Sequence, residues 1–171
     1  MKQRETREVW LRGMVPDVPA LLQPVAHCLL QAREEANALL ENFDEKYLWQ
    51  MPAGAASVAF HLQHLSGVLD RLFTYANAKT LSSEQLKTLA EEGKFDAEIN
   101  IKNLISRFNE QVDKSIDEIK IIDEQTLKEP RSVGRAQLPS TKIGLLFHAA
   151  EHTMRHVGQL LVTVKVLNAI H

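Results

Sequence analysis

Apolar residues recur along most of the chain at the three- and four-residue intervals of an amphipathic helix. The pattern predicts four long helices, over about residues 20–43, 55–76, 95–122 and 140–167. A shorter helix is predicted after Ser82, because Ser82 and Gln85 have the spacing of a capping box and Gly93 can end the helix. No segment has a convincing strand pattern. We therefore predict an all-α fold, a four-helix bundle.

The ends of two helices are less well defined by the pattern. Pro24 can either kink the first helix or mark its true start. Ser140 or Thr141 can cap the last helix. We expect residues 1–16 to form an N-terminal strap, and residues 77–94 and 123–139 to form connections.

Length and composition fit one ordinary globular domain spanning residues 1–171, with 44% apolar and 25% charged residues. A net charge of −2 gives no sign of the basic surface that binding of nucleic acid requires. No apolar stretch reaches the length of about 18 residues that a membrane span requires. A single cysteine, Cys28, fits a reducing compartment, and no signal peptide is visible. A cytoplasmic protein is the expectation.

Three of the seven histidines lie at intervals of four residues in the last helix: His148, His152 and His156. Residues four apart on a helix return to nearly the same face, so His152 and His156 can direct two imidazoles to one point. Such a pair is a usual way for a helix to supply two ligands to zinc or a similar ion, although packing histidines also have this spacing.

The second predicted helix carries His61 and His64. Periodicity places His61 nearer the border of the apolar stripe and does not decide which of the two faces the last helix. With one of them, the pair on the last helix would make three neutral imidazoles, the ligand set of a catalytic metal with an open position. The motifs of di-iron bundles, zinc peptidases and nucleotide-binding loops are all absent from the sequence.

Several other residues are candidates for lining the pocket or orienting a ligand. Glu151 and Gln159 can hydrogen-bond to imidazoles, although Glu151 has an alternative partner in Arg155, four residues on. The remaining candidates are His27, which fits a core edge as well, and Trp49, which can cover a site or plug the end of the core.

Two stretches together resemble the DinB-like (YfiT-like) superfamily. They are residues 56–65, ASVAFHLQHL, followed by Asp70-Arg71-Leu72, and residues 148–159, HAAEHTMRHVGQ, with a Trp-x-x-Pro entry at residues 49–52. The resemblance extends over nearly the whole chain. It implies a four-helix bundle with a three-histidine metal site that commonly holds zinc or nickel.

Carried over residue by residue, the resemblance implies that the ligands are His64, His152 and His156, and His61 is then expected to point away from the metal. The role of His148 stays open. Some relatives in this superfamily are thiol-dependent S-transferases, while others have no known activity.

Two functions remain at this stage. The first is a metal-dependent enzyme, a thiol S-transferase or a hydrolase, in which a divalent metal activates water or a low-molecular-weight thiol for a small-molecule substrate. The alternative is a non-catalytic metal-binding bundle with a structural or stress-related role. No nucleic acid or membrane partner is expected, and a homodimer is one candidate assembly.

Overall fold

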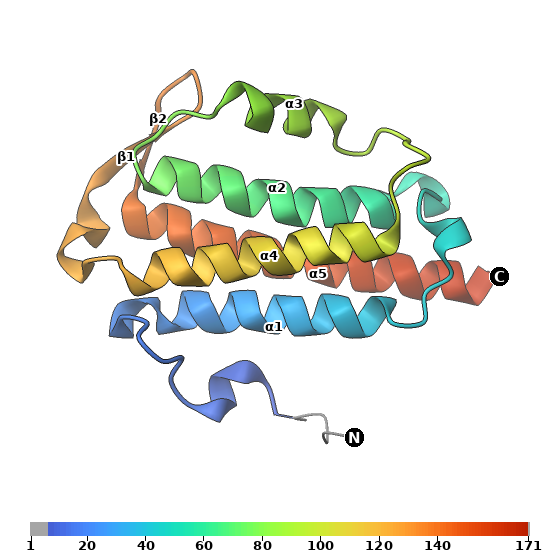
Figure 1. Cartoon of the computed structure of the whole chain (residues 1–171), viewed down its shortest axis with the longest axis horizontal. Coiled ribbons are helices and arrows are strands. Elements are labelled where there is room, and N and C mark those ends of the chain that lie inside the picture. The colour runs from blue at the N-terminus through green and yellow to red at the C-terminus, as the bar shows by residue number, and fades with distance from the viewer. Residues whose placement is uncertain (1–6, 171) are drawn as a thin grey trace.

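The computed structural model describes residues 7–170. Four long helices form a bundle: α1 (Gln23–Leu40), α2 (Val58–Ala76), α4 (Ile101–Lys120) and α5 (Lys142–Ile170). Each packs mainly on two neighbours, in the cyclic order α1, α4, α2, α5 (Figure 1). The predicted all-α four-helix bundle is confirmed.

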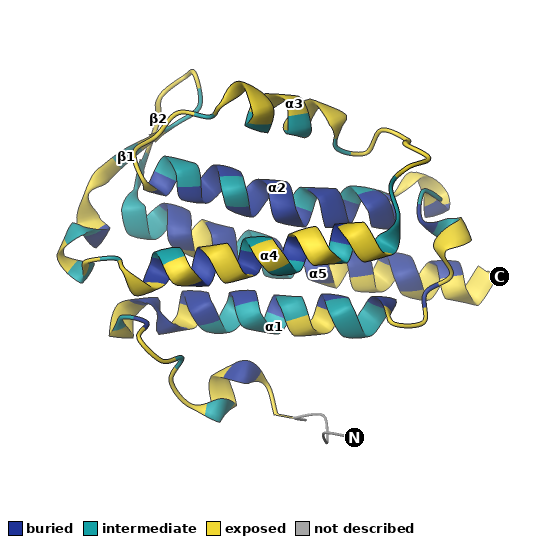
Figure 2. Ribbon diagram, in the orientation of Figure 1, coloured by how far each residue is buried: buried dark blue, intermediate teal, exposed yellow. Residues whose placement is uncertain are grey.

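A continuous apolar core lies between the four helices (Figure 2). Its largest fully buried side chains include Phe108 of α4, Leu62 and Leu65 of α2, and Leu160 of α5. α4 has the clearest division into an apolar and a charged face, because only one of its sides packs on α1 and α2. α5 is flanked by α1 and α2 and buries ten residues along its length.

Short elements connect the bundle helices. The 3-10 turns are η1 (Val9–Arg12), η2 (Ala20–Leu22), η3 (Glu45–Tyr47), η4 (Pro52–Gly54) and η5 (Glu124–Lys128). Helix α3 (Ser83–Glu91) lies outside the bundle against α2 (Figure 1). It begins with the predicted capping box, in which Ser82 and Gln85 bond reciprocally.

The connection between α4 and α5 contains two short strands that the sequence did not predict. Strand β1 (Pro130–Val133) pairs antiparallel with β2 (Leu138–Thr141), with Pro130 opposite Thr141 and Val133 opposite Leu138. Each strand is only four residues long and carries a proline, so the alternating pattern is too short to be recognised.

Helix ends differ from the prediction for local reasons. Pro24 lies in the first turn of α1, where a missing N–H costs little, so it marks the start of the helix and causes no kink. The third long helix begins at Ile101, not near Phe95, because the side chain of Asn100 accepts from the N–H of Asn103 and caps it.

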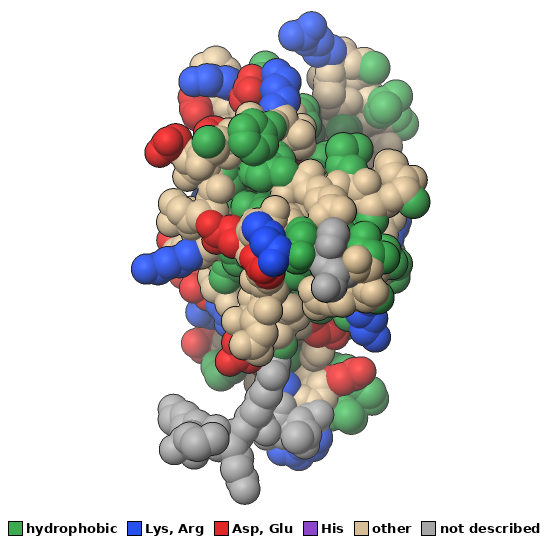
Figure 3. Space-filling model, turned by 90° about the vertical axis from the view of Figure 1, so that its right-hand side faces the viewer, with side chains coloured by type: hydrophobic (Ala, Val, Ile, Leu, Met, Phe, Trp, Pro, Cys, Tyr) green, Lys and Arg blue, Asp and Glu red, His purple; other side chains and the backbone are tan. Residues whose placement is uncertain are grey.

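Residues 1–6 of the expected strap lie outside the described residues. Within residues 7–170, no helix is both long enough and apolar enough to cross a membrane. At the end of the bundle seen in Figure 3, acidic and basic side chains are interspersed with apolar ones over the atoms that are not grey.

Candidate metal centre

The histidine-bearing part of α2 is placed by a cap at its start. The hydroxyl of Ser57 accepts a hydrogen bond from the N–H of Phe60, so the helix begins at Val58. His61 and His64 follow within two turns. Two side chains that are three positions apart point about 60° from each other around the helix axis. Both rings therefore lie on the side of α2 that packs against α5.

α5 supplies the other histidines. Oγ1 of Thr141 accepts from the N–H of Gly144 at 3.1 Å and caps the start of this helix, as predicted for one of the two candidate residues. His152 and His156 lie one turn apart further along. Their ring centroids are 4.6 Å from each other, and both rings face α2.

The three histidines predicted to converge do so. One nitrogen from each of His64, His152 and His156 lies within 4.8 Å of the other two. Nε2 of His64 is 3.0 Å from Nε2 of His152, and the rings of His64 and His156 are 4.4 Å apart between centroids. Two residues of α5 and one of α2 thus direct nitrogens to one place; that they bind a metal remains a prediction.

The expectation that His61 points away from the cluster is wrong. Its Nδ1 lies 3.2 Å from Nδ1 of His156, and only 3% of the residue is exposed. Because three residues separate it from His64, it faces the same neighbouring helix one turn earlier. His61 is therefore in contact with His156, a candidate ligand.

Glu92 is the residue of the candidate site that sequence reasoning missed. It follows α3, and its Oε2 lies 2.7 Å from Nδ1 of His64 while its Oε1 accepts from Nη1 of Arg71 at 2.6 Å. The Glu92 side chain is only 4% exposed. Its buried carboxylate therefore has a cation on one oxygen and an imidazole on the other.

Two glycines let the chain bring Glu92 to α2. Gly93 has a left-handed φ of 81°, and its N–H donates to Oε1 of Gln63 at 2.8 Å, which anchors the turn after Glu92. A Cβ on Gly67 would lie 2.4 Å from Oε1 of Glu92 and 2.6 Å from Nη1 of Arg71. Because Gly67 has no side chain, it leaves the space that the ion pair between Glu92 and Arg71 occupies.

The surroundings favour the neutral form of His61, His152 and His156 and the ionised form of Glu92. Burial, with a smaller contribution from His64, lowers the pKa of His61 to about 4, and burial together with its histidine neighbours lowers the pKa of His156 to about 4. Burial also lowers the pKa of His152. Burial alone would raise the pKa of Glu92, but hydrogen bonds from His64 and Arg71 outweigh it, and the pKa is lowered.

The ionised carboxylate of Glu92 determines which nitrogen of His64 carries a proton. An ionised carboxylate can only accept, so Nδ1 of His64 carries the proton and donates it to Glu92. In a neutral His64 ring, the form that a metal ligand requires, Nε2 carries the lone pair, and this nitrogen lies 3.0 Å from Nε2 of His152. Metal-binding histidines commonly donate their other N–H to a carboxylate in this way. The donor set therefore fits a divalent cation that accepts imidazole ligands.

The remaining candidates on α5 lie beside the cluster. Glu151 bonds to Nδ1 of His148 at 2.6 Å and to Nη2 of Arg155 at 2.5 Å, so the predicted partner four residues on is present. His148, Glu151 and His152 form a second group whose ligand atoms lie within 4.8 Å of one another. Gln159 is exposed and lines a pocket of about 510 Å³ together with His61 and Arg155.

Trp49 and His27 are not brought to the cluster. Trp49 packs against the core, and its ring meets that of Phe95 edge to face at 5.6 Å. Nε2 of His27 bonds to the carbonyl of Gly13 at 3.0 Å, on the side of α1 that faces the N-terminal segment. Trp49 therefore plugs the core, and His27 ties the N-terminal segment to α1.

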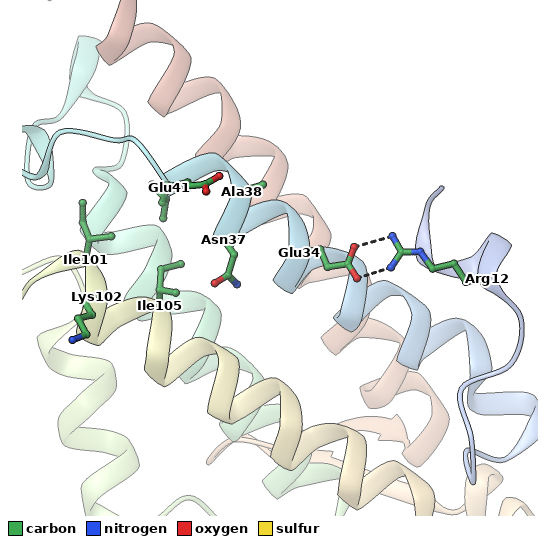
Figure 4. A pocket seen from close by; sticks show the side chains of 9 residues that line it. Arg12, Glu34, Asn37, Ala38, Glu41, Ile101, Lys102 and Ile105 are labelled. Carbon is green, nitrogen blue, oxygen red and sulfur yellow. Dashed lines mark hydrogen bonds and ion pairs between the residues drawn. The ribbon is translucent and has the colours of Figure 1, made fainter. Parts of the chain in front are cut away.

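A further cavity, of about 670 Å³, lies between α1 and α4 and is not part of this site (Figure 4). Glu34 of α1 closes one side of it by pairing with Arg12, with nitrogen–oxygen distances of 2.6 and 2.8 Å. The residues that line it include no histidine.

Fold and site together define a four-helix bundle with a three-histidine cluster between two of its helices. The chain belongs to the DinB superfamily, whose family model matches residues 29–160. The superfamily suggested by the two histidine motifs is thereby confirmed.

Two solved structures have a similar fold. One is a conserved protein from Enterococcus faecalis, with a TM-score of 0.73 and 19% identity, covering 89% of this chain and 99% of that one. The other is a protein from Streptococcus pneumoniae, with a TM-score of 0.64 and 15% identity, covering 85% and 89%. At these identities the likeness shows the fold alone. A search among curated proteins found no significant match.

Proposed function

We propose that the chain is a metal-dependent enzyme that binds a divalent ion, zinc or nickel, through His64, His152 and His156 and acts on a small molecule. The observation that carries this proposal is the convergence of the three ligand nitrogens within 4.8 Å, combined with the carboxylate that holds Nδ1 of His64. Three imidazoles would leave one coordination position for a further ligand, and a bound ion would supply Lewis-acid chemistry there, lowering the pKa of a water or a low-molecular-weight thiol.

The chain's own residues supply the surroundings of that reaction. Glu92 holds the proton on Nδ1 of His64, and Arg71 keeps Glu92 ionised. His61 contacts His156, and its ring is stacked edge to face on Phe60. Phe60 also lies parallel to the His64 ring at 5.4 Å and shields that ring from water.

The pocket beside His61 is the proposed place for the substrate. Its volume of about 510 Å³ lies in the range of small-molecule sites, and Ala55, Ala56 and Val162 give it an apolar wall. Arg155 and Gln159 at its rim offer hydrogen-bond donors. We propose that a substrate lying there has its reacting atom near His156.

One observation favours a non-catalytic metal-binding bundle as the second candidate. The two carboxylates nearest the cluster are both engaged, Glu92 with His64 and Arg71, and Glu151 with His148 and Arg155. Neither is free to act as a general base. Catalysis would then depend on proton transfer through the histidines or on a bound thiol that needs no further base.

Metal analysis and two activity screens separate these candidates. Purified protein is analysed for metal, then assayed for hydrolysis of activated esters and for transfer of low-molecular-weight thiols to an aryl halide. An enzyme of the proposed kind turns over in one screen, loses the activity with a chelator, and recovers it when zinc or nickel is restored. Stoichiometric metal without turnover supports the non-catalytic candidate. Protein that binds neither ion contradicts both.

A further inference from the structure

Helix α3 packs on the bundle without burying any of its residues. Its leucines are partly exposed, Leu86 at 43% and Leu89 at 41%. Polar contacts hold it instead: Nε2 of Gln85 donates to Asp70 at 2.6 Å and to Thr74 at 2.7 Å. An amphipathic helix normally buries its apolar face, so this one leaves part of its apolar surface open.

That surface borders a pocket of about 510 Å³ between α3, the end of α2 and the β1–β2 hairpin. Tyr75, Leu81 and Leu86 form an apolar side. The other lining residues come from the α2–α3 connection and from the hairpin: Ala78, Lys79, Thr80, Pro130, Arg131, Ser132, Gly134, Arg135 and Gln137.

The hairpin wall is fixed to the bundle. Nε of Arg131 donates to the carbonyl of Ala76 at 2.6 Å, and its Nη2 pairs with Glu129 at 2.8 Å. The side chain of Arg131 is only 9% exposed. The pocket is therefore bounded by a strand that is anchored to the end of α2.

The lining is positively charged. It contains Lys79, Arg131 and Arg135 and no aspartate or glutamate, although the whole chain has a net charge of −2. Arg131 is neutralised by Glu129, but the side chains of Lys79 and Arg135 form no ion pair with any residue in the described range 7–170. Two uncompensated cations thus stand beside an apolar wall.

We propose that this pocket binds a small organic acid with a hydrocarbon body, such as a medium-chain carboxylate. The hydrocarbon lies against Tyr75, Leu81 and Leu86, and the carboxylate lies toward Lys79 and Arg135. Burying the hydrocarbon covers apolar surface that α3 leaves open, and each cation can donate hydrogen bonds to the acid. The volume of the pocket is in the range of small-molecule sites.

This site is separate from the histidine cluster. Tyr75 lies eleven residues after His64 on α2, a rise of about 16 Å along the helix axis. No residue of the pocket belongs to the histidine groups. The proposal therefore does not depend on the metal or on any activity.

The test uses the full-length protein and the fluorescence of an anilinonaphthalene sulfonate, an aromatic anion with an apolar body. We expect one probe molecule to bind saturably and to be displaced by octanoate. Octanol, which lacks the negative charge, and inorganic phosphate, which lacks the hydrocarbon, should displace it at least tenfold less effectively. The double variant Lys79→Gln/Arg135→Gln should weaken octanoate displacement about tenfold and leave octanol unchanged. Leu86→Gln should weaken the binding of both octanoate and the probe.

The matched control is Lys87→Gln/Lys165→Gln, which removes the same charge from exposed positions outside the pocket. It should bind octanoate as the unsubstituted protein does, and circular dichroism should show equal helix content in all variants. Equal displacement of the probe by octanol and octanoate would overturn the proposal. Displacement by inorganic phosphate at the same concentration as octanoate would overturn it too. Equal weakening by the control pair, or no saturable probe binding, would also overturn it.

Discussion

The carboxylate of Glu92 lies 2.7 Å from Nδ1 of His64, although 28 residues separate the two along the chain. The same carboxylate is paired with Arg71, one of whose neighbours on α2 is the glycine that makes room for the pair. A residue from outside the bundle thereby fixes which nitrogen of a candidate ligand faces the cluster. The proposed metal site depends on α3 and on the left-handed turn at Gly93, as well as on the two histidine helices.

Replacing Glu92 by glutamine tests that dependence. An amide can donate to Nδ1 of His64, which lets the ring move its proton to Nε2 and lose the lone pair that faces His152. We expect zinc affinity to fall about 10- to 100-fold while the protein stays helical. Affinity is measured by competition with a chromogenic chelator.

Glu91→Gln is the matched control, since Glu91 is exposed and pairs with Lys94 at the surface. It should leave zinc affinity unchanged. The buried cation left unpaired by Glu92→Gln will also reduce stability, by about 3 kcal/mol or more. The double variant Arg71→Met/Glu92→Gln removes that cation, so it should regain stability without regaining zinc affinity. Full zinc affinity in Glu92→Gln would show that His64 does not need the carboxylate.

The second prediction concerns Gly67→Ala. An added Cβ would lie 2.4 Å from Oε1 of Glu92, so the carboxylate must move away from its present position. Alanine also favours the helix by about 1 kcal/mol relative to glycine. This gain is smaller than the cost of disrupting the buried pair with Arg71, about 3 kcal/mol, so we expect a net loss of thermal stability. Zinc affinity should fall at least about fivefold as Glu92 is displaced from His64.

Gly158→Ala gives the comparison on α5, where an added Cβ meets nothing within 4 Å. It should stabilise the protein by about 0.5–1 kcal/mol and leave zinc affinity as it was. If Gly67→Ala gave the same gain with full affinity, the space beneath Glu92 would be larger than the contacts indicate.

Stability of the metal-free protein should depend on pH in a defined window. The pKa values of His61 and His156 are lowered to about 4 in the folded protein, so the unfolded chain takes up protons first as pH falls. Stability is therefore full above about 6.5, the ordinary histidine value, and decreases as pH falls toward 4. Urea unfolding between pH 4 and 8 measures the slope.

His61→Asn should flatten that slope, because it removes one of the two depressed groups. Glu92 affects stability at lower pH. Because its pKa is lowered in the folded protein, its contribution is full above the ordinary pKa of a glutamate and is lost only as pH falls below that value. Stability that stays constant from pH 6.5 to 4.5 would mean that the two imidazoles are not held neutral by the fold.

The apolar periodicity was sufficient to predict the helices of the bundle, and the histidine spacing was sufficient to predict that His152 and His156 converge. Both features depend on neighbours within one helix. The choice between His61 and His64 was not accessible in this way. Both rings face α5, and they differ in what lies behind them: His64 is held by Glu92, whereas His61 contacts His156. That difference arises from packing between helices, which periodicity does not encode.

Glu92 itself had no sequence signal. It stands in a charged run, Glu91-Glu92-Gly93-Lys94, that is typical of a solvated surface, and Glu91 indeed is exposed. The left-handed Gly93, its bond to Gln63 and the space at Gly67 together let the Glu92 side chain turn inward. A glycine after an acidic residue is common at helix ends, so the pattern alone could not identify a buried carboxylate.

The last prediction removes one ligand, by His156→Ala. The apolar core includes Leu146, Val157, Leu160 and Val164 of α5, and none of these depends on the histidine ring. A chain of this length can fold without a metal, so the variant should keep its helix content. Two remaining imidazoles form a weaker site that is open to water, and we expect less than about a tenth of the zinc to remain after dialysis.

His148→Ala is the matched variant, because His148 is also on α5 but lies outside the group of three. It should keep stoichiometric zinc in the same dialysis. Loss of zinc from both variants would mean that the second group, with Glu151 and His152, also takes part in binding. Unfolding of His156→Ala alone, seen by circular dichroism, would make the metal a structural support of the bundle, and retention of zinc by that variant would remove His156 from the ligand set.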